Sequence, residues 1–139
     1  MNKLYDFNAI GYVAATFPVS ADAQTYLKTH HLNAKTGNVD INGKNLAVKL
    51  NEDGTVGFGA GAATDALLGI IIAYEMDGSA SVQLIGGRDE VPTAAAIKAG
   101  VKGLVVNAKG EIVESADGGK QVIVAKPSTA ENLFASIML

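Results

Sequence analysis

Hydrophobic residues along most of this chain fall into short runs that are separated by glycine-containing turns. From about residue 36 onward, Asn-Gly, Asp-Gly and Lys-Gly pairs alternate with apolar segments of strand length. Asn and Asp followed by Gly tolerate the positive φ angles of tight hairpin turns, so this spacing predicts an all-β domain. The predicted strands cover residues 46–50, 55–58, 67–74, 80–85, 103–106, 111–113 and 121–125.

The apolar pattern also predicts which strand faces are buried. Residues 46–50 and 80–85 alternate apolar with more polar positions, which indicates one buried and one wetter face. Ile70, Ile71 and Ile72 do not alternate. We therefore expect this strand to be covered on both faces, by a second sheet or by a neighbouring subunit.

Two segments carry helix signals. Ser20 is suited to cap a helix that has Asp22 in its first turn and ends near His30 and His31. Residues 92–100 begin with proline and end with glycine, which predicts a second short helix.

The last segment is compatible with two structures. Ser128 and Glu131 have the spacing of a helix capping box. Leu133, Ala135 and Ile137 alternate as in a strand that closes a sheet. The strand is favoured, and the helix stays open as the alternative.

Residues 1–38 differ in composition and turn pattern from the rest of the chain. They lack glycine-punctuated hairpins and contain both histidines and most of the tyrosines. We interpret residues 1–38 as an extended N-terminal arm with a short helix, and residues 39–139 as the β domain. Terminal segments that are not tied into a sheet are usually mobile unless a partner orders them.

Composition and charge exclude several function classes. The chain has 139 residues, no cysteine and a net charge of −3, with the charges scattered singly. This length fits one domain, and the lack of cysteine excludes disulfides and thiol catalysis. Without a basic face, nucleic-acid binding is not expected. The N-terminus lacks a signal-peptide pattern and the longest apolar run, residues 66–74, is about half a membrane span, so we expect a soluble protein with no membrane partner.

One motif suggests a nucleotide cofactor. Gly57, Gly59 and Ala62 match the dinucleotide-binding pattern G-x-G-x-x-A, and Asp77 follows about 20 residues later. That motif requires a long helix directly after the glycines, and only about two helical turns fit before the isoleucine strand. We interpret the segment as a flexible loop and expect no cofactor.

The polar residues form no recognisable catalytic or metal-binding pattern. His30 and His31 are adjacent, so they lack the i, i+4 spacing of a helical zinc site. The serines lack a G-x-S-x-G motif. Most acidic residues flank turns, and turn chemistry accounts for them: Glu52, Asp53, Glu75, Asp77, Asp89, Glu90, Glu111 and Glu114. We expect no enzyme activity, no metal and no small-molecule substrate.

A small β carrier or ligand-binding domain is an alternative of another class. Such carriers display a modified lysine at a hairpin tip, and Lys44 and Lys109 lie in predicted turns. Neither lysine is flanked by the methionine that carrier domains have. A carrier would be a monomer with added mass or a bound small molecule.

The central part of the chain resembles a known family in the order of its glycines and apolar residues. The matching segments are LAVKLNEDGTV at 46–56, LGII at 68–71, GSASVQLIGG at 78–87 and IKAGVKGLVVNAKGEI at 97–112. Over about residues 44–125 they are similar to the small head-decoration, or capsid cement, proteins of tailed bacteriophages. The family commonly has an acidic residue after the Ala-Gly pair, where this chain has Val101.

This resemblance implies a compact β-barrel or β-tulip that forms a homotrimer on the outer surface of a virion. It implies that the protein is made in the bacterial host cytoplasm, binds the major capsid protein, clamps neighbouring coat subunits and has no active site. A head-fibre base or anchoring protein is the alternative within this class. We expect the arm and the loop of residues 57–68 to make the contacts. The candidate contact residues are Tyr5, Phe7, Tyr12, Phe17, Phe58 and Leu67.

Overall fold

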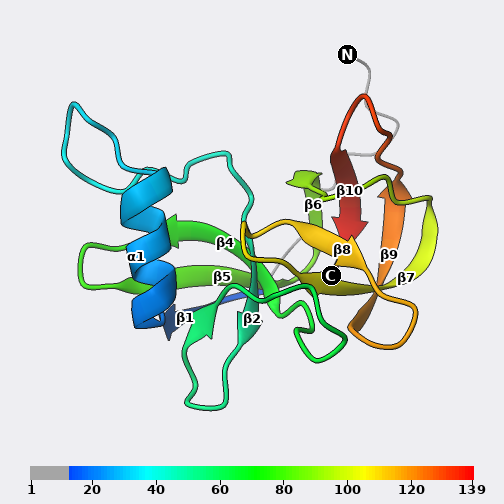
Figure 1. Ribbon diagram of the computed structural model, residues 1–139, viewed down its shortest axis with the longest axis horizontal. Helices are drawn as coiled ribbons and strands as arrows, with labels where there is room; N and C mark the ends of the chain where they lie inside the picture. The colour runs from blue at the N-terminus through cyan, green and yellow to red at the C-terminus, as the bar shows by residue number, and fades with distance from the viewer. Residues whose placement is uncertain (1–12) are drawn as a thin grey trace.

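The computed structural model describes residues 13–139 of the chain. Two antiparallel sheets of five strands each make up most of this part, so the predicted mainly β fold is confirmed. The first sheet has the strand order β1-β5-β4-β2-β3, and the second has the order β6-β10-β9-β7-β8. One of the two sheets curls into a half-barrel (Figure 1). The elements are β1 (Val13–Pro18), α1 (Ala21–His30), β2 (Ala47–Leu50), β3 (Val56–Gly57), β4 (Gly69–Tyr74), β5 (Ser79–Ile85), β6 (Gly87–Pro92), β7 (Gly100–Val106), β8 (Ile112–Glu114), β9 (Lys120–Lys126) and β10 (Phe134–Met138).

Three of the predicted glycine turns join paired strands as hairpins. Gly54, Gly78 and Gly110 adopt positive φ angles in the turns that join β2 to β3, β4 to β5 and β7 to β8. A side chain at these positions would meet the steric penalty of the left-handed region, which explains why the turns contain glycine.

The chain passes from the first sheet to the second at a single residue. Gly86, with a φ of 109°, lies between β5 and β6. The backbone N–H of Leu139 donates a hydrogen bond of 2.9 Å to the Gly86 carbonyl, so the last residue of the chain is attached at the same junction.

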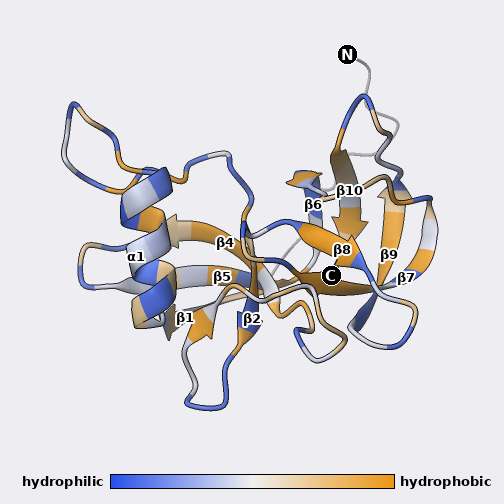
Figure 2. Ribbon diagram, in the orientation of Figure 1, coloured by the Kyte–Doolittle hydropathy of each residue, from blue (hydrophilic) through white to orange (hydrophobic). Residues whose placement is uncertain are grey.

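Two separate hydrophobic cores lie on the two faces of the first sheet. The first core fills the inside of the second sheet and includes Ile70 of β4. The second core lies between the first sheet and α1, and it includes Ile71 of β4 and Leu27 of the helix. Figure 2 shows apolar strands in both sheets and a helix with polar residues on its outer side. The predicted two-sided burial of the isoleucine strand is therefore confirmed, and the chain covers both faces by itself.

The helix predicted after Ser20 is confirmed. The Ser20 side chain accepts a hydrogen bond from the Ala23 backbone N–H at 3.3 Å, which caps α1 at its first turn. At the other end, the His31 N–H donates to the Leu27 carbonyl at 2.8 Å. Leu27 is fully buried, so α1 covers one face of the first sheet (Figure 1).

The prediction of a second helix at residues 92–100 is wrong. Pro92 ends β6, and residues 93–99 form an irregular connection to β7. Long-range contacts hold this connection: the Ile97 N–H donates to the Ser128 hydroxyl at 2.9 Å, and the Thr93 hydroxyl bonds to the same oxygen at 2.9 Å. Ile97 is 1% exposed, so its burial in the first core outweighs the local helix signal.

Strands near both ends of residues 13–139 belong to the sheets. The last segment is a strand as favoured, because β10 pairs with β6 and β9. The short helix expected within residues 1–38 is α1, whereas residues 13–18 of the expected arm belong to the first sheet. Residues 13–18 form β1, which pairs with β5 along its whole length, and α1 packs on the same sheet.

A side-chain clamp joins the loop before β2 to β6. The Asn45 amide donates to the carbonyls of Asp89 and Glu90, at 3.0 and 3.1 Å, and accepts from the Arg88 guanidinium at 3.0 Å. Asn45 and Glu90 both have positive φ angles. This clamp is a tertiary contact that no local sequence pattern indicates.

Candidate interaction surface

The outer face of the second sheet carries an apolar row that crosses three strands. Val101 of β7 is the register partner of Ile123 of β9, and Ile123 is the partner of Met138 of β10. Val101 is 67% exposed and Ile123 is 50% exposed, whereas Met138 is half-buried. Partners in an antiparallel pair lie on the same face of the sheet, so the three side chains are neighbours on the surface.

The alternation of the strands explains how this row arises. In β9, Val122 and Val124 point into the first core, so Ile123 between them points outward. Gln121, two residues before Ile123 on the same face of β9, is exposed and uncharged as well. We call Val101, Gln121, Ile123 and Met138 the outer row.

A second exposed apolar pair lies at the edge of the first sheet. Val13 of β1 and Ile85 of β5 are register partners, 52% and 56% exposed. Ile85 precedes Gly86, to which Leu139 is hydrogen-bonded, so this pair lies near the end of β10. Within residues 13–139, β1 pairs with β5 alone and has no charged residue, although edge strands commonly carry charges against further pairing.

The predicted contact residues have different positions. Tyr5, Phe7 and Tyr12 lie outside the described residues. Phe17 is half-buried and packs against the second core. Phe58 is half-buried and packs against both cores.

Leu67 was predicted to contact a partner, and this prediction is wrong. The residue is 2% exposed and belongs to the first core, where its N–H donates to the Leu104 carbonyl at 3.1 Å. Its side chain packs inside the first core, so it has no exposed surface for a partner to contact.

The loop after Gly57 is organised around a carboxylate. Asp65, in the segment that resembles a dinucleotide motif, accepts hydrogen bonds from the backbone N–H groups of Ala60 and Ala62 at 2.7 and 3.1 Å. Its other oxygen accepts from the Lys49 ammonium group at 2.8 Å. In a dinucleotide site these amides would face a phosphate. Here Asp65 takes that position, and the hydrogen bonds from Lys49 and the loop amides hold the pKa of its carboxyl below the ordinary value.

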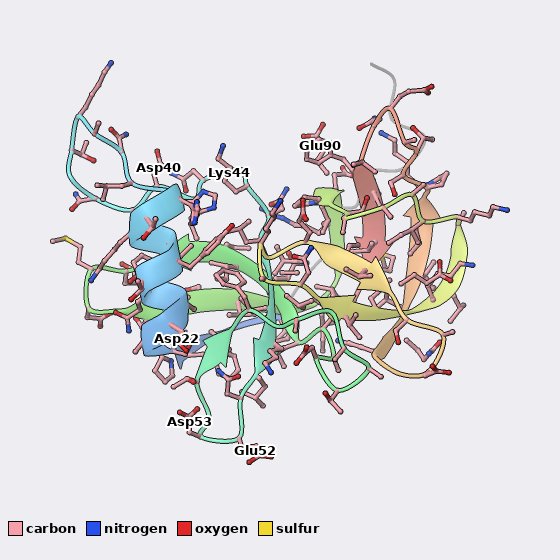
Figure 3. All side chains as sticks on the ribbon, in the orientation of Figure 1. Asp22, Asp40, Lys44, Glu52, Asp53 and Glu90 are labelled. Carbon is pink, nitrogen blue, oxygen red and sulfur yellow. The ribbon has the colours of Figure 1, made fainter. Side chains whose placement is uncertain are left out.

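The other polar candidates do not come together in one place. Within residues 13–139, no three His, Asp or Glu side chains are arranged to hold a metal ion. His30 and His31 end α1, and burial lowers the pKa of His31, with the positive charges of Lys44 and His30 as smaller causes. Glu52 and Asp53 project from the tip of the β2–β3 hairpin (Figure 3). No helix in this part of the chain is long and apolar enough to cross a membrane.

The outer row is a feature that the sequence reasoning missed. A signal for it exists in residues 121–125, where Ile123 occupies the outward position between two inward valines. The partners on β7 and β10 follow only from the register of the sheet, which the sequence pattern does not specify.

Comparisons of this chain with protein-family models, with curated proteins and with solved structures find no match.

Proposed function

We propose that this protein is a structural virion component that binds the outer surface of a phage capsid and stabilises contacts between major coat subunits. The outer row is the observation that carries this proposal. The order of strands and glycines over residues 44–125, which is similar to the capsid cement proteins, supports it.

The composition of the outer row is that of a protein contact. The centres of protein interfaces are depleted in charged residues and enriched in apolar ones, including methionine. Val101, Ile123 and Met138 have that character and lie on a rigid sheet, which orders the contact before binding.

Many weak contacts on one shell would act together. A capsid presents the same coat surface repeatedly, so an oligomer of this chain would gain avidity from simultaneous binding. A homotrimer with one outer row per subunit is the proposed form. Within residues 13–139, β1 is an edge strand, and it offers a second contact where an extended coat segment could add main-chain pairing.

Co-sedimentation with expanded capsids of the virus that encodes the chain tests this function. We expect the wild-type protein to bind and to raise the temperature at which the capsids release their contents. Ile123→Asp places a charge at the centre of the outer row and should abolish binding. Met76→Asp is the matched control, because Met76 is 91% exposed at the β4–β5 turn, away from the second sheet.

Two results would contradict the proposal. One is wild-type binding that Ile123→Asp leaves unchanged, since the outer row would then not be the contact. The other is a native mass spectrum of a monomer with added covalent or bound mass, together with no capsid binding. That result would favour the carrier or ligand-binding alternative.

A further inference from the structure

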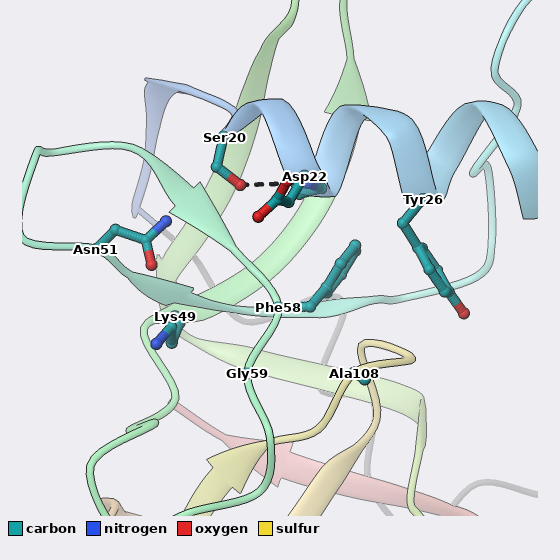
Figure 4. A pocket seen from close by; sticks show the side chains of 9 residues that line it. Ser20, Asp22, Tyr26, Lys49, Asn51, Phe58, Gly59 and Ala108 are labelled. Carbon is teal, nitrogen blue, oxygen red and sulfur yellow. Dashed lines mark hydrogen bonds between the residues drawn. The ribbon is translucent and has the colours of Figure 1, made fainter.

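An open pocket of about 440 Å³ lies beside the N-terminal half of α1, away from the outer row. Its lining comes from three regions of the chain: the helix, the β2–β3 hairpin and the loops at residues 59 and 108 (Figure 4). The volume is in the range of small-molecule sites, about 300–1,000 Å³. The side chains that define the pocket chemically are Ser20, Asp22, Tyr26, Lys49, Asn51 and Phe58.

One end of the pocket is aromatic. The rings of Phe58 and Tyr26 are in edge contact, with centroids 5.1 Å apart and planes at 65°. Tyr26 also contacts His30, whose ring centroid is 4.3 Å away. These two ring contacts fix the orientation of Tyr26 without a ligand. Phe58 is anchored by both cores, so the aromatic end is preorganised.

The opposite end of the pocket is polar and has unused hydrogen-bonding capacity. Asp22, Asn51 and Lys49 lie there (Figure 4). Among residues 13–139, the Asp22 carboxylate has no ion pair or hydrogen-bond partner. The Asn51 amide nitrogen donates to the Thr55 hydroxyl at 3.0 Å, which leaves its oxygen as an acceptor. Lys49 uses one of its three protons on Asp65.

This combination selects a neutral ligand with many hydroxyl groups. An anion is disfavoured, because Asp65 already neutralises Lys49 and Asp22 adds a negative charge at the same end. A purely apolar ligand would leave these donors and acceptors desolvated and unpaired. A saccharide has a C–H face that packs on aromatic rings and hydroxyls that both donate and accept.

We propose that this pocket binds a neutral saccharide unit. Its C–H face would rest on Phe58 and Tyr26, and its hydroxyls would donate to Asp22 and Asn51 and accept from Lys49. This inference does not depend on capsid binding, since the residues involved lie beside α1 and not on the second sheet.

The surface next to the pocket indicates a ligand longer than one unit. Beyond Tyr26, the side chains of His30, His31, Asp40 and Lys44 border a second hollow of about 280 Å³. Figure 3 places Asp22 near one end of α1 and Asp40 and Lys44 near the other. We therefore expect a linear oligosaccharide to bind more tightly than a single sugar.

The test is a titration of the full chain, labelled with ¹⁵N, followed by amide chemical shifts. The probes are methyl β-glucopyranoside, methyl β-galactopyranoside, methyl α-mannopyranoside, N-acetylglucosamine, and the tetramers of glucose and N-acetylglucosamine. At least one probe should shift amides of residues 20–26, 49–51 and 57–59. Tyr26→Ala and Asp22→Ala should each weaken its binding about tenfold.

Lys28→Ala is the control on the same helix, because Lys28 is exposed and borders a different hollow beside Tyr74. Its affinity should equal that of the wild type, and the dispersion of each spectrum reports whether the variant is folded. The proposal is overturned if no saccharide shifts these amides, or if Tyr26→Ala binds as well as wild type. A larger response to inorganic phosphate than to any saccharide would also overturn it and would indicate an anion site.

Discussion

Ile70 and Ile71 are consecutive residues of β4 that belong to two different hydrophobic cores. Ile70 is completely buried with the side chains of the second sheet, and Ile71 is 2% exposed beneath α1. Successive side chains of a strand point to opposite faces, so β4 forms the wall between the two cores. The protein therefore depends on this strand for packing on both sides.

Truncation at either isoleucine should destabilise the protein strongly. We expect Ile70→Ala and Ile71→Ala each to lower the free energy of unfolding by about 2–5 kcal/mol, because each leaves a cavity in a closed core. Ile72→Ala is the control, since Ile72 is only partly buried and should lose less. Urea denaturation measures all three. Equal losses at Ile71 and Ile72 would contradict the two-core arrangement.

The Lys49–Asp65 contact should make stability depend on pH in the acid range. The folded state lowers the pKa of Asp65, chiefly through the hydrogen bond from Lys49 and then through the loop amides. A lowered pKa means that the contribution is present above the unfolded pKa of about 4 and is lost as the pH falls through the folded pKa. Asp65→Asn should lower the free energy of unfolding by about 1–3 kcal/mol at neutral pH. The stability of this variant should also fall less steeply as the pH is lowered.

Thermal unfolding from pH 7 down to pH 2 is the measurement for Asp65→Asn. Glu52→Gln is a suitable control, because Glu52 is exposed at a hairpin tip and makes no hydrogen bond through its side chain to residues 13–139. If the stability of Asp65→Asn falls as steeply with decreasing pH as that of the wild type, other carboxylates cause the loss of stability in acid.

Removal of the Ser128 hydroxyl should loosen the connection between β6 and β7. Its oxygen is bonded to the Ile97 N–H and the Thr93 hydroxyl, and all three residues are buried. Ser128→Ala leaves these donors without a partner, which we expect to cost about 1–3 kcal/mol. Hydrogen exchange should show faster exchange of the Ile97 amide. Ser115→Ala, in the exposed loop after β8, should leave that amide protected.

Gly69 is required by close packing of the backbone. A Cβ atom at this position would lie 2.1 Å from the Gln83 carbonyl oxygen of the neighbouring strand. We expect Gly69→Ala to lower the unfolding free energy by at least about 3 kcal/mol or to prevent folding. Gly37 provides the comparison, because it has a positive φ of 72° but no atom near the added Cβ. Gly37→Ala should cost only about 1 kcal/mol. Denaturant titration of both variants tests whether Gly69→Ala is the more destabilising substitution.

Strands and turns were predictable where the signal is local. The Asp-Gly turns at Gly54 and Gly78 and the Ser20 cap depend on the conformations of a few neighbouring residues, and the structure has them as expected. Two-sided burial of Ile70 and Ile71 was also readable, because an apolar run without alternation has only that physical solution in a sheet.

The errors occur where tertiary contacts outweigh local preference. Residues 92–100 have helix signals at both ends, but burial of Ile97 and its bond to Ser128 keep the segment irregular. Residues 13–18 are not followed by a hairpin turn, because their partner β5 lies about 60 residues later in the chain. The sequence around residues 13–18 therefore does not indicate the pairing. The burial of Leu67 likewise follows from the position of the second sheet.

The sequence by itself determined the mainly β class, the position of the helix and the turns, since these depend on period, capping and the left-handed conformations of glycine. Only the tertiary structure decided the two proposed binding surfaces. The outer row exists because the register aligns Val101, Ile123 and Met138 across three strands. The pocket exists because packing of α1 brings Tyr26 beside Phe58. Both require contacts between residues far apart in the chain, and such contacts are set by the packing of the cores and not by local pattern.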